Sequence, residues 1–208
     1  MKTKVIKTIK GTLKTAQLKE IADVLKNGGI VIMPTDTVYA VAANAFCHKS
    51  CLEIYRLKGR HYRKPLVIMP QSSLELGKIA HLNEKTKKIV SKFWPGPLTL
   101  ILKTNHLGKI LMGGRDNLGA RIPKSSLLKA LMKYCTFPLA TTSANPSVKP
   151  SAKNAQEAIK YFDGKVAVII DGGPCQIGKE STVIDVSGFP FVVVRKGCLD
   201  SKKLLPYM

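Results

Sequence analysis

The stretch GIVIMPTDTVY, residues 29–39, joins a run of branched apolar residues to a group of small polar side chains. Residues 29–33 are typical of a buried strand, and Pro34 ends it because proline cannot donate to a strand ladder. Thr35, Asp36 and Thr37 follow at once. Taken alone, this TDT segment is equally consistent with a simple turn held by the aspartate side chain. At the end of a rigid strand, polar side chains are also typical of ligand contacts.

Helical and strand patterns alternate on both sides of this stretch. Upstream, the apolar spacing over residues 18–25 predicts a helix with one buried face, ended by the glycine pair at 28–29. Downstream, the patterns predict helices at residues 50–58, 83–94 (capped by Asn83), 125–134 and 154–162, and strands at residues 66–69, 98–102, 138–140, 166–170, 182–186 and 191–195. The sequence therefore predicts an α/β fold, a single domain over residues 1–208 with a twisted mixed sheet flanked by helices.

Composition limits the class of protein. With 45% hydrophobic residues in a chain of 208, there is enough apolar surface for a core. No apolar run approaches the ~18 residues that span a bilayer, and residues 1–7 lack the core of a signal peptide. The five cysteines show no C-x-x-C spacing, which indicates reduced thiols. We therefore expect a cytoplasmic protein with no membrane partner.

The charge balance is the strongest compositional signal. Lys and Arg number 34 against 13 Asp and Glu, which gives a formal net charge of +21. Such a field attracts nucleic acids, nucleotides or anionic membrane surfaces. Only six of the 34 basic residues are Arg, however, and a surface rich in Lys is also what solubility alone would produce. Charge by itself therefore leaves RNA binding open.

Two short segments far apart in the chain carry the clearest chemistry. Residues 58–60, Lys-Gly-Arg, place two cations beside a glycine, and residues 143–145, Ser-Ala-Asn, place two hydrogen-bonding side chains after an apolar run. Cations together with small polar donors suit a polyphosphate group. Lys64 follows the first segment, and Arg121 follows residues 117–120. Each of these alone is more often a solvated charge or a helix cap, so only their joint occurrence indicates a site.

Other common sites are not supported. Residues 173–179 spell G-x-x-x-x-G-K, but Glu180 replaces the Ser or Thr that a P-loop needs, and the residues after it favour a strand. The potential zinc ligands Cys47, His48 and Cys51 have no fourth ligand at zinc spacing. The four histidines have no Ser or Cys partner motif for a nucleophilic triad, and G-x-G-x-x-G does not occur. The sequence therefore predicts no metal site in the protein itself.

Five motifs in this order resemble the threonylcarbamoyl-AMP synthases, whose catalytic domain is called the YrdC domain. Besides the two segments above, the motifs are PTDTVY at residues 34–39, KPL at 64–66 and GKESTVID at 178–185. The resemblance runs from about residue 29 to residue 197. It implies a YrdC-like α/β fold, in agreement with the secondary-structure patterns.

The resemblance also implies an enzymatic activity, that of a nucleotidyltransferase. Threonylcarbamoyl-AMP synthases make L-threonylcarbamoyladenylate from L-threonine, bicarbonate or CO2, and ATP, and release pyrophosphate. Mg2+ is the implied cofactor, which would accompany ATP and share the charge of its triphosphate. Partner proteins, the threonylcarbamoyl transferases, then attach the group to adenosine 37 of tRNA. RNA itself, as tRNA or double-stranded RNA, is a further partner to which the charge points.

The resemblance assigns roles to individual residues of this chain. Four match the signature tetrad around ATP and are the expected catalytic residues: Lys58, Arg60, Ser143 and Asn145. The nucleotide-binding set comprises Arg60, Lys64, Asn117, Ser143, Ser151 and Arg195. The set around L-threonine comprises Thr37, Arg121, Thr141 and Ser181. In this set, Arg121 is expected to hold the α-carboxylate through a two-pronged bridge.

Three positions depart from the pattern of the resembled family. Ala40 stands where a glycine usually follows Thr-Val-Tyr, and Val148 stands where the Ser-Ala-Asn segment usually ends in Ser-Gly. Met69 lies where some members place His or Cys near threonine, so it is left out of the expected site. None of the three departures removes a charged residue of the expected site.

Two alternatives stay open at this point. The first is a binding module for double-stranded RNA or tRNA in ribosome maturation or translation, since this fold offers a concave basic surface. The second is the related domain of carbamoyltransferase maturation factors, which normally lies inside a much longer chain with acylphosphatase and zinc-finger segments. Release of pyrophosphate that depends on threonine separates the synthase from both alternatives.

Overall fold

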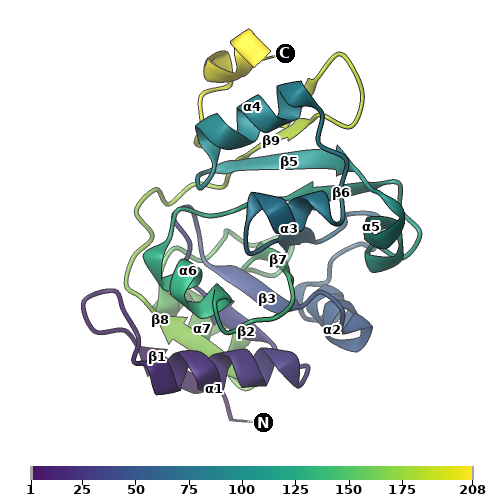
Figure 1. Cartoon of the computed structure of the whole chain (residues 1–208). Helices are drawn as coiled ribbons and strands as arrows, with labels where there is room; N and C mark the ends of the chain where they lie inside the picture. The colour runs from purple at the N-terminus through teal and green to yellow at the C-terminus, as the bar shows by residue number, and fades with distance from the viewer. Residues whose placement is uncertain (1, 208) are drawn as a thin grey trace.

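A ten-stranded sheet forms the centre of the computed structural model, which describes residues 2–207 (Figure 1). The strand order is β1-β8-β2-β3-β7-β4-β6-β5-β9-β10. Parallel and antiparallel pairs both occur, so the sheet is mixed, as the sequence predicts. The strands are β1 (Lys4–Lys7), β2 (Val31–Met33), β3 (Ala40–Asn44), β4 (Val67–Met69), β5 (Leu98–Lys103), β6 (Asn117–Ala120), β7 (Leu139–Ser143), β8 (Val168–Asp171), β9 (Thr182–Asp185) and β10 (Val192–Arg195).

Helices flank this sheet, and local capping explains where several of them begin. They are α1 (Thr15–Lys26), α2 (His48–Lys58), α3 (Ser73–Gly77), α4 (Glu84–Phe93), α5 (His106–Leu111), α6 (Ser126–Met132), α7 (Ala155–Phe162) and the 3-10 helix η1 (Ser201–Tyr207). The predicted cap of α4 is confirmed, because Oδ1 of Asn83 accepts a hydrogen bond of 2.8 Å from the backbone N–H of Thr86. α2 ends at Lys58, where Gly59 adopts the left-handed conformation with φ of 57°. This turn redirects the chain between Lys58 and Arg60.

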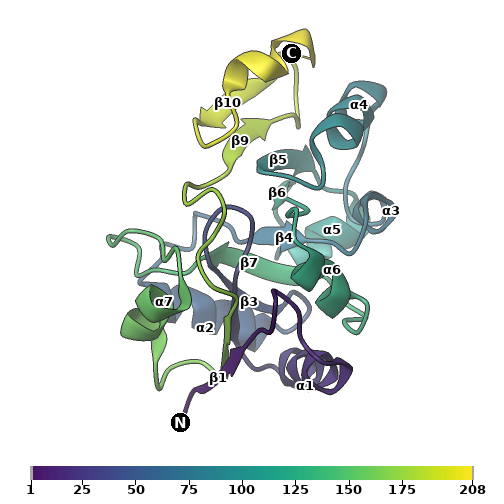
Figure 2. The same cartoon turned by 90° about the vertical axis from the view of Figure 1, so that its left-hand side faces the viewer.

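Two apolar clusters cover the two faces of the sheet, because side chains alternate along each strand. On β2, Ile32 belongs to one cluster, while Val31 and Met33 belong to the other. Helices α2, α4 and α7 pack on the first cluster, and α1 and α6 pack on the second. Helices therefore cover both faces, as the sequence predicts. α1 and α4 lie at opposite ends of the molecule in both views (Figures 1 and 2).

The same alternation provides a polar face for a site. On β5, Leu98 and Leu100 are fully buried in the first cluster, which α4 covers. The residues between and after them, Thr99 and Ile101, face the other side of the sheet, where they line a cavity. This face is continuous with the second cluster, but here it carries polar side chains from β7 and from Ser181, the residue just before β9. The fold thus places a cavity where the helical cover of α1 and α6 ends.

The structure differs from the predicted elements in a few places. The predicted strand at residues 138–140 extends to Ser143, so Thr141 and Ser143 lie within β7 and do not follow it. β3 was not predicted, because its sequence AVAAN is rich in alanine, which has low strand propensity. Its pairing with both β2 and β7 makes it a strand. β1, β6, α3 and α5 were also not predicted from their short patterns.

The G-x-x-x-x-G-K segment and the lengths of the helices bear on two kinds of structure, a P-loop and a membrane span. After Lys179 the chain enters β9 at Thr182 with no intervening helix, which confirms that the G-x-x-x-x-G-K segment does not open a helix as a P-loop does. Within residues 2–207, no helix combines the length and the apolar character that a membrane crossing requires.

Candidate functional site

A cavity of about 710 Å³ lies on the polar face of the sheet. It is lined by β3, β4, β5, β6, β7, β9 and β10, together with the loop between α2 and β4. Most of the residues predicted for the site contribute to its wall: Thr37, Arg60, Lys64, Asn117, Arg121, Thr141, Ser143, Ser181 and Arg195. Lys58, Asn145 and Ser151 do not line it and lie buried next to it.

The wall of the cavity is strongly basic. Its cations are Arg60, Arg63, Lys64, Arg121 and Arg195. Among the lining residues of the part of the chain that is described, Glu180 is the one carboxylate. A cavity with such an excess of positive charge favours anionic ligands.

Arg60 is held in place by the loop that it starts. Its Nε donates to the carbonyl oxygen of Lys64 at 2.8 Å, and its Nη2 donates to that of Pro65 at 3.0 Å. Burial lowers the pKa of this guanidinium, and the nearby charge of Arg195 lowers it further. Two of its nitrogens thus donate to backbone carbonyl groups, and within residues 2–207 Nη1 has no hydrogen-bond acceptor. The side chain is positioned before any ligand arrives.

Arg195, whose charge acts on Arg60, is anchored in a similar way. Its Nε and Nη2 donate to the carbonyl oxygen of Ser181 at 3.1 and 2.8 Å, and Nη2 also donates to the Ser181 hydroxyl at 3.1 Å. The hydroxyls of Ser181 and Thr99 are 2.8 Å apart. A residue predicted to contact nucleotide therefore touches one predicted to contact threonine. The two predicted sets of site residues meet at this point.

The sequence suggested that Lys58 and Arg60 both face one ligand. The structure places only Arg60 in the cavity wall, and Lys58 lies behind it. Its side chain is buried at 3% exposure, and Nζ donates to the carbonyl oxygens of Ser143 and Asn145 and, at 3.0 Å, to Oδ1 of Asn145. Burial and the charge of Arg60 lower the pKa of Lys58 to about 7. The three oxygen acceptors around Nζ oppose this effect by favouring the ammonium form. Lys58 thus ties the end of α2 to the end of β7.

Asn145 is the centre of the network that Lys58 supports. Its Oδ1 accepts a hydrogen bond of 2.7 Å from the Ser143 hydroxyl, and its Nδ2 donates to the carbonyl oxygen of Lys149 at 2.6 Å. The Ser151 hydroxyl lies 3.5 Å from the same Oδ1 and donates to Glu180 at 2.7 Å. Of these residues, Ser143 and Glu180 line the cavity. The network fixes their positions from behind.

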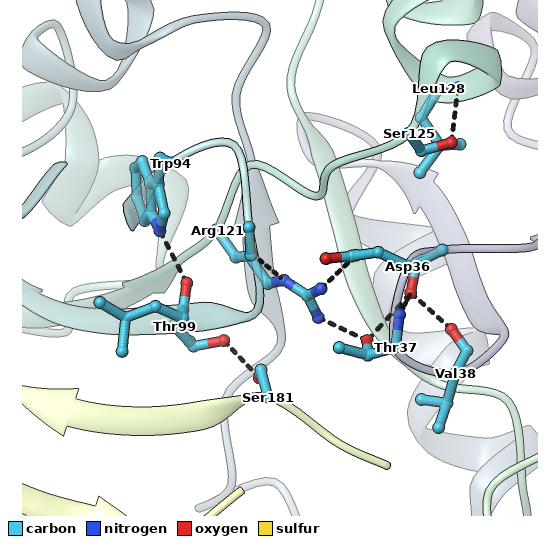
Figure 3. Close-up of polar contacts among 12 residues, drawn as sticks. Asp36, Thr37, Val38, Trp94, Thr99, Arg121, Ser125, Leu128 and Ser181 are labelled. Carbon is cyan, nitrogen blue, oxygen red and sulfur yellow. Dashed lines mark hydrogen bonds and ion pairs between the residues drawn. The ribbon is translucent and has the colours of Figure 1, made fainter. Parts of the chain in front are cut away.

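Arg121 is a buried residue of the cavity wall, and its nitrogens are already paired with protein acceptors (Figure 3). Nε donates to the carbonyl oxygen of Gly96 at 2.9 Å, Nη1 donates to the Thr37 hydroxyl at 2.7 Å, and Nη2 is paired with Asp36. Each η nitrogen carries a second hydrogen. A carboxylate ligand can therefore still be bound, while the protein partners fix the plane of the guanidinium.

Asp36 is a part of this arrangement that the sequence did not assign to the site. Its side chain is 3% exposed, and within the described residues no donor reaches its Oδ2. Burial raises the pKa of Asp36, and the charge of Arg121 opposes the increase. The sequence offered one signal, an acid between the two threonines of the TDT segment. That signal could not show which cation Asp36 would meet, because Arg121 lies on a distant strand end.

The three departures from the family pattern have separate environments. Ala40 and Met69 both line the cavity, so Met69, which was left out of the expected site, belongs to its wall. Val148 is 91% exposed in the loop after Asn145. A second cavity of about 430 Å³ shares Met69 and Pro123 with the first. The rest of its wall is separate, and its lining within residues 2–207 includes none of the predicted site residues.

Fold and cavity together define a class: an α/β protein with a mixed sheet and a preformed basic site for anionic ligands. Comparison with known proteins then identifies the family. The family of Sua5, YciO and YrdC, described as telomere recombination, matches residues 23–197. A putative threonylcarbamoyl-AMP synthase from Methanocaldococcus jannaschii is 38% identical, with 98% of each chain covered. The chain belongs to the Sua5/YciO/YrdC family.

Other relatives are longer than this chain. Threonylcarbamoyl-AMP synthase from Pyrococcus abyssi is 35% identical over 96% of this chain, which spans 59% of that relative. The solved structure of P. abyssi Sua5 complexed with L-threonine has 32% identity and a TM-score of 0.91, and covers all of this chain and 61% of that one. The YrdC-like fold expected from the motifs is thereby confirmed.

Proposed function

We propose that the protein is an L-threonylcarbamoyladenylate synthase, which converts L-threonine, bicarbonate or CO2, and ATP to threonylcarbamoyl-AMP and pyrophosphate. The observation that carries the proposal is the contact between Arg195 and Ser181, which joins the predicted nucleotide and threonine sets in one basic cavity. The names of the curated relatives support the same activity. A P. abyssi relative has been solved with L-threonine.

In this proposal, ATP occupies the side of the cavity where Arg60 and Arg195 are anchored. Arg60 and Arg195 pair with phosphate oxygens, and the remaining nucleotide contacts come from Lys64, Asn117, Ser143 and Ser151. Ser151 is buried at 8% exposure and is not part of the cavity wall. Ser151 therefore acts on nucleotide binding indirectly, by positioning Glu180 and Asn145, or contacts the nucleotide only after a local opening of the loop. Mg2+ arrives with ATP as part of the substrate and shares the triphosphate charge.

Threonine occupies the side formed by Thr37, Arg121, Thr141 and Ser181. The Arg121 fork holds the α-carboxylate. The threonine amine adds to CO2, and an oxygen of the resulting carbamate attacks the α-phosphorus of ATP, from which pyrophosphate leaves. No protein nucleophile is required. The protein must bring two anions together and offset their repulsion, which is a task of positioning and electrostatics.

The catalytic tetrad divides into two roles in this proposal. Arg60 and Ser143 line the cavity and contact the reactants, while Lys58 and Asn145 act from behind as positioning residues. The product would be passed to threonylcarbamoyl transferase proteins for modification of tRNA at adenosine 37. We place this work in the cytoplasm, on the basis of the cysteine usage.

The direct test is release of pyrophosphate by the purified chain with ATP, bicarbonate and Mg2+. We expect release to depend on L-threonine. Arg60→Ala should lower kcat/KM for ATP by about 10- to 100-fold, because a charge-assisted hydrogen bond contributes about 1.5–3 kcal/mol. Arg56→Ala is the matched control, since the Arg56 side chain is 72% exposed and pairs with Glu53 on the surface of α2.

Two outcomes would contradict the proposal. The first is a folded preparation that releases no pyrophosphate with threonine. The second is equal activity of the Arg60→Ala and Arg56→Ala variants, which would mean that the cavity is not the nucleotide site.

A further inference from the structure

The basic cavity contains one group of the opposite charge. Arg60, Arg63, Lys64, Arg121 and Arg195 contribute positive charge to its wall, and Glu180 is the lining carboxylate within residues 2–207. A carboxylate in this place repels the triphosphate of ATP and weakens the binding of every anionic reactant. Its presence in the wall is explained if one of the reactants brings a positive group to it.

Glu180 is held in a defined position. Its Oε1 accepts the 2.7 Å hydrogen bond from the Ser151 hydroxyl, and its backbone oxygen accepts a hydrogen bond of 2.9 Å from Cys198. The hydrogen bond from Ser151 lowers the pKa of Glu180, so the group is ionised at neutral pH. The side chain is only half-buried. One carboxylate oxygen is thus tethered, and in the described part of the chain the other has no bonded partner.

The neighbours of Glu180 indicate which positive group it meets. The next residue is Ser181, which belongs to the threonine set and is bonded to Thr99 and Arg195. Threonine enters as a zwitterion, with a carboxylate that suits Arg121 and an ammonium group that five cations would repel. A carboxylate beside Ser181 offsets that repulsion.

We propose that Glu180 binds the α-ammonium group of the amino-acid substrate and so makes the site selective for amino acids over hydroxy acids. The inference rests on the proposed function, because it assigns one more contact to the same threonine site. In this arrangement Arg121 and Glu180 bind the two ends of the zwitterion. The amine is then held on the side of Ser181, where Arg195 connects the threonine set to the nucleotide set.

The test is a comparison of two ligands and two proteins by titration calorimetry without ATP or metal. The ligands are L-threonine and 2,3-dihydroxybutyrate, in which a hydroxyl replaces the ammonium group. We expect Glu180→Gln to weaken threonine binding about tenfold or more, as the loss of a charge-assisted hydrogen bond does. Its affinity for 2,3-dihydroxybutyrate should stay within about twofold of wild type, because that ligand has no charge for Glu180 to meet.

Control variants separate this role from a purely structural one. Glu84→Gln makes the same change in net charge at an exposed position of α4 and should bind both ligands like wild type. Ser151→Ala removes the tether but keeps the carboxylate, so it should still prefer threonine over the hydroxy acid. If Glu180 only supported Ser151, Ser151→Ala would lose this preference as well, which would overturn the inference.

Three further outcomes each have a defined meaning. Unchanged threonine affinity in Glu180→Gln, with a wild type that does bind threonine, would overturn the inference but leave the proposed function standing. If Glu180→Gln bound threonine normally in the calorimetry but needed more Mg2+ for pyrophosphate release, the carboxylate would be assigned to the metal that accompanies ATP, which would also overturn the inference. A wild-type chain that binds no threonine would overturn the proposed function itself.

Discussion

Lys58 and Arg60 are two residues apart and carry the same charge, yet the structure gives them different surroundings. Gly59 in the left-handed conformation turns the chain between them. Arg60 is directed to the cavity with its Nε and Nη2 on loop carbonyls, while Lys58 is enclosed by Ser143 and Asn145. The sequence indicated that both segments belong to one site. It could not show that one cation faces the ligand and the other supports the wall, because this depends on the backbone direction at Gly59.

The burial of Lys58 leads to a pH-dependent contribution to stability. Its pKa is lowered to about 7 in the folded protein from 10.5 in the unfolded chain. Between these values the unfolded state binds more protons, so the free energy of unfolding of the wild type should rise with pH. Lys58→Met should lower stability by about 1–3 kcal/mol through unsatisfied carbonyl oxygens, and should lose this rise. Urea denaturation of both proteins at pH 6.5 and pH 9.5 measures the difference.

We expect the difference in free energy of unfolding between wild type and Lys58→Met to increase with pH. Parallel pH profiles for wild type and Lys58→Met would show that Lys58 keeps its proton throughout. In that case the three oxygen acceptors around Nζ would outweigh the burial of the charge.

At the scale of elements, the sequence predicted positions along strands better than it predicted which strands meet. Residues 29–33 and 98–102 were predicted as strands, because their branched apolar side chains have a clear pattern. β3 was missed, although it is fully enclosed between β2 and β7. Its alanines carry no local strand signal, and only the neighbouring strands define it. The pairing of Asp36 with Arg121 was missed for the same reason, since it depends on tertiary contacts.

Gly197, two residues after β10, packs against the backbone at the start of β9, and this close contact leads to a prediction. A Cβ atom on Gly197 would lie 2.3 Å from the carbonyl carbon of Ser181 and from the nitrogen of Thr182. Gly197→Ala should therefore push Ser181 out of place, lower the free energy of unfolding by about 1–3 kcal/mol and weaken threonine binding. Gly188→Ala, where nothing lies within 4 Å, is the matched control. Thermal unfolding and threonine titration of the two variants provide the measurements.

A normal threonine affinity in a stable Gly197→Ala variant would contradict this expectation. It would mean that the backbone at Ser181 can move away without any effect on the bound amino acid.

At the scale of the whole molecule, the net charge of +21 does not describe the site. Of the 34 basic residues, six are Arg, and four of these six line the cavity: Arg60, Arg63, Arg121 and Arg195. Lys64 is the one lysine in the wall among the described residues. Guanidinium groups are weakly hydrated and can be fixed through several donors, so they suit a partly buried site better than ammonium groups do. Composition alone suggested anionic partners, but could not show this division between arginine and lysine.

The last prediction separates the field of the whole molecule from the charges of the site. Lys88 and Lys92 are exposed on α4, which packs against the face of β5 opposite the cavity. Replacing both with Gln removes two charges, yet kcat/KM for ATP should stay within about twofold of wild type, because salt screens charges more than about 10 Å apart. Arg60→Ala removes only one charge, yet it should lower kcat/KM for ATP far more than the double variant does.

Binding of tRNA by the same double variant tests whether the lysine-rich surface has a use of its own. If RNA contacts this part of the surface, affinity should fall and the slope of log K against log salt should decrease by about two, as two phosphate contacts are lost. An unchanged slope would exclude Lys88 and Lys92 from RNA contact. A large loss of ATP turnover in the double variant would instead show that long-range attraction, and not the anchored arginines, controls access of the nucleotide to the cavity.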